Sequence, residues 1–131
     1  MFKEKLGLDI IGKVAFKMDN GATIRYKNSI QATAKQIVSL AIIQNAQALI
    51  DTIELYLVGV LVSSRPITAR SIVNSTEVQF DCLFDGPSFT GPIDEARLKA
   101  SALGYFSIVT GVSVTKTSTA SLLVSWTIQI V

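Results

Sequence analysis

The stretch that decides the fold is Leu122–Val131, LLVSWTIQIV. Every second residue in it is large and apolar, and this two-residue period is that of a β-strand with one buried face. The residues on the apolar face are Leu122, Val124, Trp126, Ile128 and Ile130. A strand at a terminus frays unless it is paired and packed. We therefore expect this strand to lie inside a sheet, with a neighbouring strand on each side.

The composition is apolar for a chain of this length. The 131 residues are 49% hydrophobic, and only 17% are charged. Soluble domains carry about 25% charged residues, and small domains have much surface per residue. We expect one domain over residues 1–131, and a monomer of that size would leave apolar side chains in water. Other protein subunits are therefore expected to cover part of the surface.

Composition also argues against two kinds of partner. Uninterrupted apolar runs such as Val58–Val62 are far shorter than the roughly 20 residues of a membrane-spanning helix, so we expect no membrane partner. The net charge is only +2 and the 12 Lys and Arg residues are scattered along the chain, so we expect no nucleic-acid partner. Cys82 is the single cysteine, which excludes an internal disulfide and fits synthesis in a reducing cytosol.

The first third of the chain predicts a hairpin followed by a helix. Asn20 and Gly21 separate two short alternating runs, as in a tight β-hairpin turn. From residue 28 onward the apolar residues recur with the period of an amphipathic helix, which we expect to span Asn28–Ile43. Asn28 would cap the first turn, and Gln31 would complete a capping box.

Alternation in the rest of the chain predicts further strands. Thr52–Val62 is interpreted as one long strand, which the segment around Pro66 interrupts. Glu77–Asp85 is a half-buried strand, and shorter elements follow near residues 93–98, 105–109 and 112–116. With one helix, this order predicts a mainly β, α+β fold: an antiparallel β-sandwich, or a sheet with one amphipathic helix packed on it.

The sequence contains no recognisable catalytic or metal-binding motif. Histidine, the commonest general base and metal ligand, is absent. Glycine-rich nucleotide-binding loops do not occur either. Solvated loop acids are the favoured interpretation of Asp81, Asp85 and Asp94, with a cation site among them as the alternative. We therefore expect a protein that is not an enzyme and holds no cofactor.

Candidate contact residues come from two segments. The apolar stripe of the predicted helix is wide enough to contact more than one neighbour, and the loop around Pro66 joins two strong strands. The predicted protein-interface residues are Ile30, Leu40, Ile43, Arg65 and Arg70.

Several short motifs occur in a suggestive order. They are Asn28–Ile30 (Asn-Ser-Ile), then Ile93, Glu95 and Leu98 in a pattern like Ile-x-Glu-x-Gly-Leu, then Lys116 and Thr117, and finally the closing Leu122, Val124, Trp126, Thr127 and Ile128. This order resembles small virion structural proteins of tailed bacteriophages, including domains that attach tail fibres. It covers about two thirds of the chain. Arg97 departs from the pattern, because it stands where Gly is usual.

The resemblance implies a non-enzymatic structural protein of the head, neck, tail or fibre-attachment region, made in the host cytoplasm and residing in the virion. Its partners would be other virion proteins, in a symmetric homo-oligomer or multi-copy assembly. The residues alone also allow a glycan- or ligand-binding β-sandwich, in which Tyr26, Tyr56 or Tyr105 would stack on a sugar. A β-rich pore-forming subunit is a further alternative.

Overall fold

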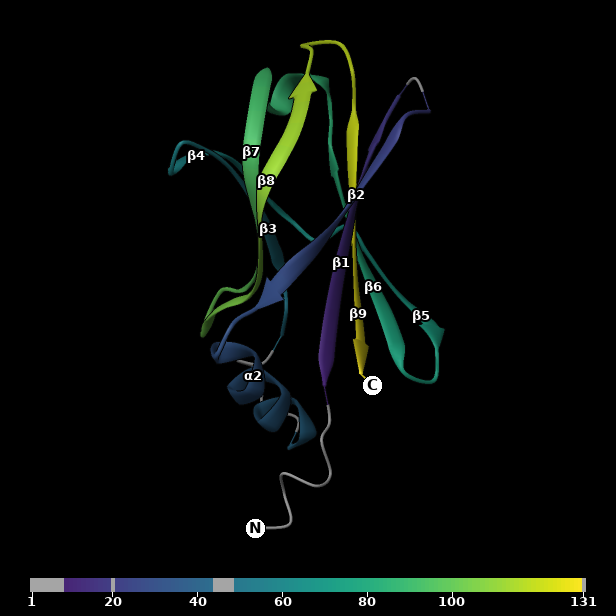
Figure 1. Ribbon diagram of the computed structural model, residues 1–131, viewed down its shortest axis with the longest axis vertical. Coiled ribbons are helices and arrows are strands. Elements are labelled where there is room, and N and C mark those ends of the chain that lie inside the picture. The colour runs from purple at the N-terminus through teal and green to yellow at the C-terminus, as the bar shows by residue number, and fades with distance from the viewer. Residues whose placement is uncertain (1–8, 20, 44–48, 131) are drawn as a thin grey trace.

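The computed structural model describes residues 9–19, 21–43 and 49–130, and within them nine antiparallel strands form one curled sheet (Figure 1). The strand order is β4-β3-β7-β8-β2-β1-β9-β6-β5. The prediction of a mainly β fold with one helix is confirmed. The strands are β1 (Ile10–Met18), β2 (Thr23–Ile30), β3 (Thr52–Leu57), β4 (Val60–Pro66), β5 (Ala69–Asn74), β6 (Glu77–Phe84), β7 (Gly91–Ala100), β8 (Gly104–Lys116) and β9 (Leu122–Ile130), and the helices are α2 (Thr33–Ile42) and the short 3₁₀ helix η2 (Gly86–Ser88).

Strand β9 lies between β1 and β6, as the alternation of its sequence predicts. Trp126 is opposite Val14 on β1 and Phe80 on β6, and its side chain is fully buried. Val131, the last residue of the predicted strand, lies outside the described residues. Because both edges of β9 are paired and one face is packed, the strand forms the centre of its half of the core.

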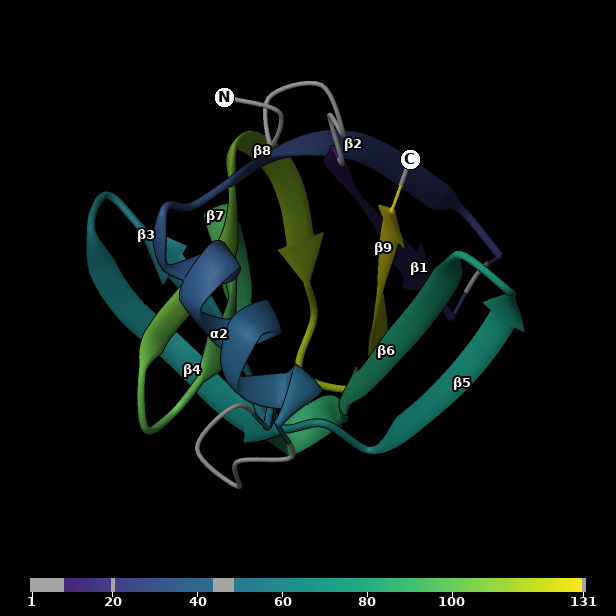
Figure 2. The ribbon, with the colours of Figure 1, turned by 90° about the horizontal axis from the view of Figure 1, so that it is seen from below.

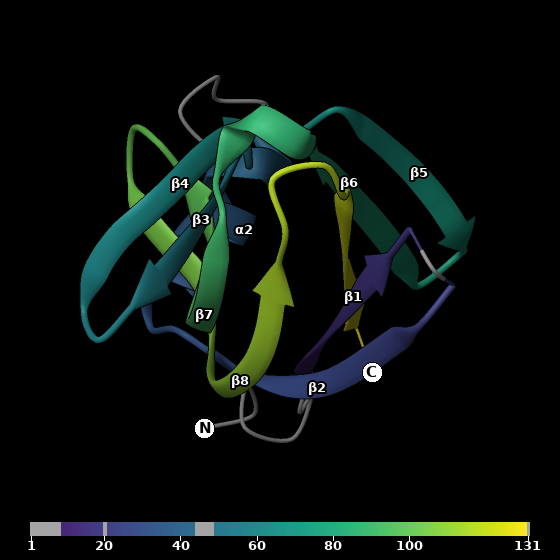
Figure 3. The same ribbon diagram turned by 90° about the horizontal axis from the view of Figure 1, so that it is seen from above.

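The sheet curls around the core, so that β4, β3, β7 and β8 face β1, β9, β6 and β5, with β2 crossing between the two groups (Figures 2 and 3). Phe16 and Trp126 pack from one side, and Leu55 and Leu98 from the other. Helix α2 lies across one end of the enclosed space (Figure 2), where Ile37 joins the core. No helix in the described ranges is long and apolar enough to cross a membrane.

The predicted hairpin is confirmed as β1 and β2. Met18 donates its backbone N–H to the carbonyl of Ala22, and Gly21 has φ +87°, a conformation that a residue without a Cβ adopts without strain. Asn20 lies outside the described residues.

The predicted start of the helix at Asn28 is wrong. Strand β2 continues to Ile30, where it pairs with Ser107 of β8, and α2 begins only at Thr33, without a side-chain cap. The Asn28 carboxamide oxygen accepts a hydrogen bond from the Ser107 hydroxyl and lies over Gly12 of β1, where a Cβ would collide with it. These contacts from distant strands outweigh the local helical period.

The long strand predicted over Thr52–Val62 is also wrong, because the chain reverses at Val58 and Gly59. Both residues have positive φ, +49° and +75°, and β3 pairs with β4 across this turn. A β-branched residue rarely adopts positive φ. The carboxylate of Asp94 accepts the backbone N–H of Val58 at 3.1 Å, which supports the turn.

Two further segments differ from the prediction. Residues 105–109 and 112–116 form one long strand, β8, and Gly111 has a positive φ of +70° within it. The interruption around Pro66 is short, because β4 ends at Pro66 and the edge strand β5 begins at Ala69. Proline is tolerated there because β4 is the other edge of the sheet.

Candidate functional site

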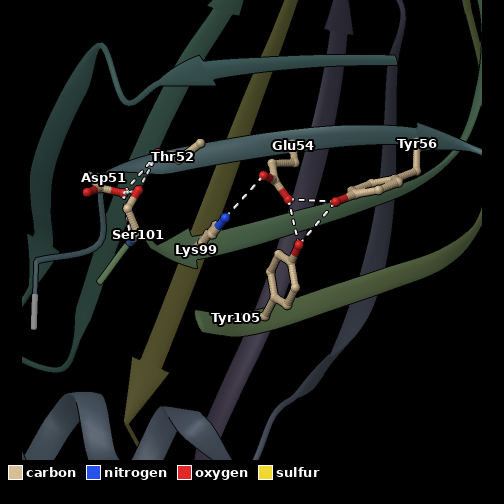
Figure 4. Close-up of polar contacts among 7 residues, drawn as sticks. All are labelled: Asp51, Thr52, Glu54, Tyr56, Lys99, Ser101 and Tyr105. Carbon is tan, nitrogen blue, oxygen red and sulfur yellow. Dashed lines mark hydrogen bonds and ion pairs between the residues drawn. The ribbon is translucent and has the colours of Figure 1, made fainter. Parts of the chain in front are cut away.

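The densest group of polar side chains lies on the outer face of β3, β7 and β8 (Figure 4). We call it the polar cluster; its members are Glu54, Tyr56, Lys99 and Tyr105, which Figure 4 shows, together with Arg97. On β3 these residues alternate with Ile53 and Leu55, which belong to the core. The cluster forms because the strand register places Glu54 opposite Arg97, and Lys99 opposite Tyr105.

Glu54 is the centre of the polar cluster. Its Oε1 accepts hydrogen bonds from the hydroxyls of Tyr56 at 2.7 Å and Tyr105 at 2.9 Å, and its Oε2 lies 3.4 Å from Lys99 Nζ (Figure 4). Burial alone would raise the pKa of the Glu54 carboxyl, but these three partners together hold that pKa below its ordinary value. The carboxylate is therefore ionised at neutral pH, with three donors around it.

Both tyrosines of the polar cluster donate their hydroxyl hydrogens to Glu54. Burial, followed by the hydrogen bonds with Tyr105 and Glu54, raises the pKa of Tyr56 far above its ordinary value. The Tyr56 phenol therefore stays neutral and donates to a Glu54 carboxylate that stays charged. The arrangement stabilises three neighbouring strands.

Arg97 covers the tyrosine rings of the polar cluster. Its guanidinium carbon lies 4.0 Å from the ring centroid of Tyr56 and 4.8 Å from that of Tyr105, and its Nε donates to Glu95. These are cation–π distances. One face of each ring is therefore occupied by the protein's own side chain.

A second polar contact, next to the cluster, fixes the start of β3. Asp51 Oδ1 accepts hydrogen bonds from the hydroxyls of Thr52 at 2.8 Å and Ser101 at 2.7 Å (Figure 4). Burial acts to raise the pKa of Asp51, but these bonds and the nearby charge of Arg70 lower it overall. The contact joins β3 to the turn between β7 and β8.

The predicted interface residues come from the end of β2, from α2 and from the β4–β5 region. Ile30 and Leu40 are half-buried and pack against the core, whereas Ile43, at the end of α2, is 70% exposed. Arg65 forms an ion pair of 3.1 Å with Asp85, and Arg70 donates to the backbone carbonyl of Ile50 at 2.8 Å. Both arginines therefore hold the chain around the β4–β5 connection, and an interface role for these five residues stays a prediction.

The alternative cation site is not formed. Among the described residues no three Cys, Asp or Glu side chains converge as metal ligands. Asp81 accepts from Gln79, Asp85 pairs with Arg65, and Asp94 accepts from Val58.

Cys82 is buried on the core face of β6, as its position in the alternating strand suggests. Burial raises the pKa of its thiol to about 12, a shift that the charge of Arg65 only partly opposes. The thiol is therefore protonated and unreactive at neutral pH.

Lys116 is a fully buried lysine at the end of β8. Its ammonium donates to the backbone carbonyls of Gly86 at 2.6 Å, Phe89 at 2.8 Å and Thr117 at 3.0 Å. All three N–H donors are thus used, and the side chain fixes the turn that contains η2.

Exposed apolar side chains gather at the two edges of the sheet. The β5 patch consists of Ile72, Val73 and Val78, and the β4 patch of Val58, Val60 and Leu61. Sequence reasoning missed both groups, since strand periodicity does not reveal which strand ends a sheet. The available signals were Val58-Gly59, a turn-like pair inside an apolar run, and the adjacent Ile72 and Val73.

No family model, curated protein or solved structure matches this chain.

Proposed function

We propose that the protein is a non-enzymatic structural component of a bacteriophage virion, in the head, neck, tail or fibre-attachment region, and that it acts through contacts between subunits. It would be made in the host cytoplasm and reside in the virion with other virion proteins. The observation that carries the proposal is the pair of apolar patches at the two edges of the sheet. The motif resemblance supports the same class.

The β5 patch has the properties of a surface that another chain covers. All six residues of β5 are exposed; Ile72 is 80% and Val73 51% exposed. Soluble monomers usually protect an edge strand with Lys or Pro, and β5 contains neither, although a register shift after Ile72 twists its end. Its one cation, Arg70, is directed to the carbonyl of Ile50.

The β4 patch gives each copy a second contact surface. Val58 is 81% and Val60 67% exposed, at the hairpin between β3 and β4. Patches on the two opposite edges of one sheet allow a copy to contact two neighbours. Such head-to-tail contacts close into a ring when the rotation between copies permits it.

The polar cluster is consistent with a structural role. Its central carboxylate accepts from Tyr56, Tyr105 and Lys99, and these contacts join β3, β7 and β8.

Sedimentation velocity of the full chain tests the proposal. Replacing Ile72 with Lys places a charge in the β5 patch and should dissociate the assembly. The matched control is Ser71→Lys, on the same exposed strand but on its opposite face. Loss of the assembly in Ile72→Lys but not in Ser71→Lys is expected; identical sedimentation of both variants and the unmodified chain would overturn the role of the patch.

The alternative, a glycan- or ligand-binding β-sandwich, has less support. The described strands hydrogen-bond into one sheet, and Arg97 occupies one face of Tyr56 and of Tyr105. Specific hits on a glycan array that disappear in Tyr105→Ala would favour this alternative over the virion proposal.

A further inference from the structure

Four cationic side chains lie together on the outer face of β1 and β2. We call this surface the basic face; its residues are Lys13, Lys17, Arg25 and Lys27, and all four are exposed. On β1 they alternate with Val14 and Phe16, which belong to the core. The register places Lys13 opposite Lys27 and Arg25 opposite Ala15. Pairing of the strands thus gathers charges that look scattered in the sequence.

The basic face borders a shallow groove of about 620 Å³ that extends over β9 to β6. Its other polar side chains include Thr23, Gln79, Ser125 and Thr127, and no carboxylate lines it. The carboxylate of Asp81, also on β6, accepts a hydrogen bond from Gln79 at 2.9 Å. Positive charge and hydroxyl groups therefore predominate along the groove.

The charges of the basic face are not compensated within the described residues. None of the four cations forms an ion pair there. Lys13 and Lys27 are directly opposed, and like charges in that position destabilise a sheet. A bound polyanion would remove this repulsion.

We propose that the basic face binds the phosphate backbone of a nucleic-acid duplex without reading its sequence. Phosphate oxygens are bound by Lys and Arg together with Ser, Thr and Gln side chains, which is the set found here. Cores of protein–protein interfaces are instead depleted in Lys and enriched in aromatic residues. Three of these four cations are Lys, so the composition favours a phosphate backbone over an acidic protein surface.

A duplex is favoured over a single strand because single-strand sites stack bases on exposed aromatic rings. Tyr26 is the one aromatic residue that borders the groove. Its ring packs edge-on against Phe16, and its hydroxyl accepts the backbone N–H of Ser113 at 3.1 Å. The ring is therefore part of the core packing.

This binding is independent of the apolar patches and of the proposed virion role. It runs against the expectation from net charge that nucleic acid is not a partner, and a binding experiment decides between the two.

Fluorescence anisotropy of a labelled DNA duplex with the full chain measures the affinity as salt is raised. With four phosphate contacts, affinity should fall roughly 150-fold between about 50 and 200 mM salt.

The double variant Lys13→Gln/Lys27→Gln should bind more weakly and lose only roughly tenfold over about the same salt range, because two contacts remain. Lys35→Gln is the matched control, since it removes one exposed charge on α2, away from the groove. No duplex binding at low salt, equal weakening by Lys35→Gln, or equally effective competition by poly-glutamate would each overturn the proposal. Tighter binding of single-stranded DNA than of the duplex would overturn the assignment to a duplex.

Discussion

Two isoleucines flank Val78 in the same row of the sheet, yet their surroundings differ. Ile128 of β9 and Ile72 of β5 both pair with Val78 of β6 and share its face. Exposure rises along the row, from 6% at Ile128 through 36% at Val78 to 80% at Ile72. The core therefore ends within three strands, although the apolar side chains continue to the edge.

The difference teaches that an apolar side chain stabilises the fold only where a second layer covers it. Ile128 has a strand on each side and the opposite half of the curled sheet above it, whereas β5 has no strand beyond it. Burial of an isoleucine side chain contributes about 1.5–3 kcal/mol. We infer that Ile72 gains the corresponding contribution only when another chain covers it.

The largest expected effect compares these two positions directly. Ile128→Ala should lower the free energy of unfolding by about 2–5 kcal/mol, because it opens a cavity in the core. Ile72→Ala should change the free energy of unfolding of the dissociated chain by no more than about 0.5 kcal/mol. Urea denaturation at low protein concentration measures both, and similar losses at the two positions would contradict the difference in coverage.

Lys116 extends the comparison from buried apolar to buried polar side chains. Lys116→Met should cost about 2–3 kcal/mol of unfolding free energy, since it leaves the carbonyls of Gly86, Phe89 and Thr117 without their donor. Lys35→Met, at an exposed position on α2, is the control. Chemical denaturation measures the free energy of unfolding of both variants. A nearly unchanged value for Lys116→Met would contradict the stabilising role of its three hydrogen bonds.

The polar cluster has an intermediate environment, because it lies on an outer face of the sheet yet its central residue, Glu54, is buried. Glu54→Gln should lower the free energy of unfolding by about 1–2 kcal/mol at pH 7. The pKa of Glu54 is depressed in the folded state, so its contribution is present above the unfolded pKa of about 4.3 and is lost as pH falls through the lower, folded value. The free energies of unfolding of the unmodified chain and of Glu54→Gln should therefore converge from neutral to acid pH. A difference that stays constant with pH would contradict the depressed pKa of Glu54.

The smallest expected effect concerns the exposed basic face. Lys13→Thr removes a like-charge pair with Lys27 and should raise the free energy of unfolding by about 0.2–1 kcal/mol at low salt. The gain should shrink at high salt because exposed charges are screened. Thermal unfolding at two salt concentrations measures it, and a loss of stability at both would show that Lys13 has a packing role.

The parts of the fold that the sequence predicts correctly have strong local patterns. Glu77–Asp85 and the closing strand alternate cleanly, and Asn20-Gly21 marks a hairpin; each corresponds to an observed strand or turn. The predicted helix start at Asn28 and the predicted continuous strand through Val58 are wrong for a common reason. Contacts with Gly12 and Ser107 in one case, and with Asp94 in the other, set their conformation, and such contacts between distant strands leave no local period.

To predict the basic face and the β5 patch, one must know the order and register of the strands in the sheet as well as the strands themselves. Lys13 and Lys27 are 14 positions apart in sequence and meet only because β1 pairs with β2 in a defined register. Given the predicted hairpin, alternate positions on its two strands could have indicated a shared face. No comparable signal places β5 at the edge, since its pairing with β6 resembles that of β9 until the whole order is known.

The measurement that tests the central claim most directly is the molar mass of the full chain in solution, by size-exclusion chromatography with light scattering over a range of concentrations. If the two edge patches are covered by further copies, the molar mass will be a multiple of 14.1 kDa that falls on dilution. A constant 14.1 kDa at high concentration, with no binding to other particle proteins, would contradict the claim.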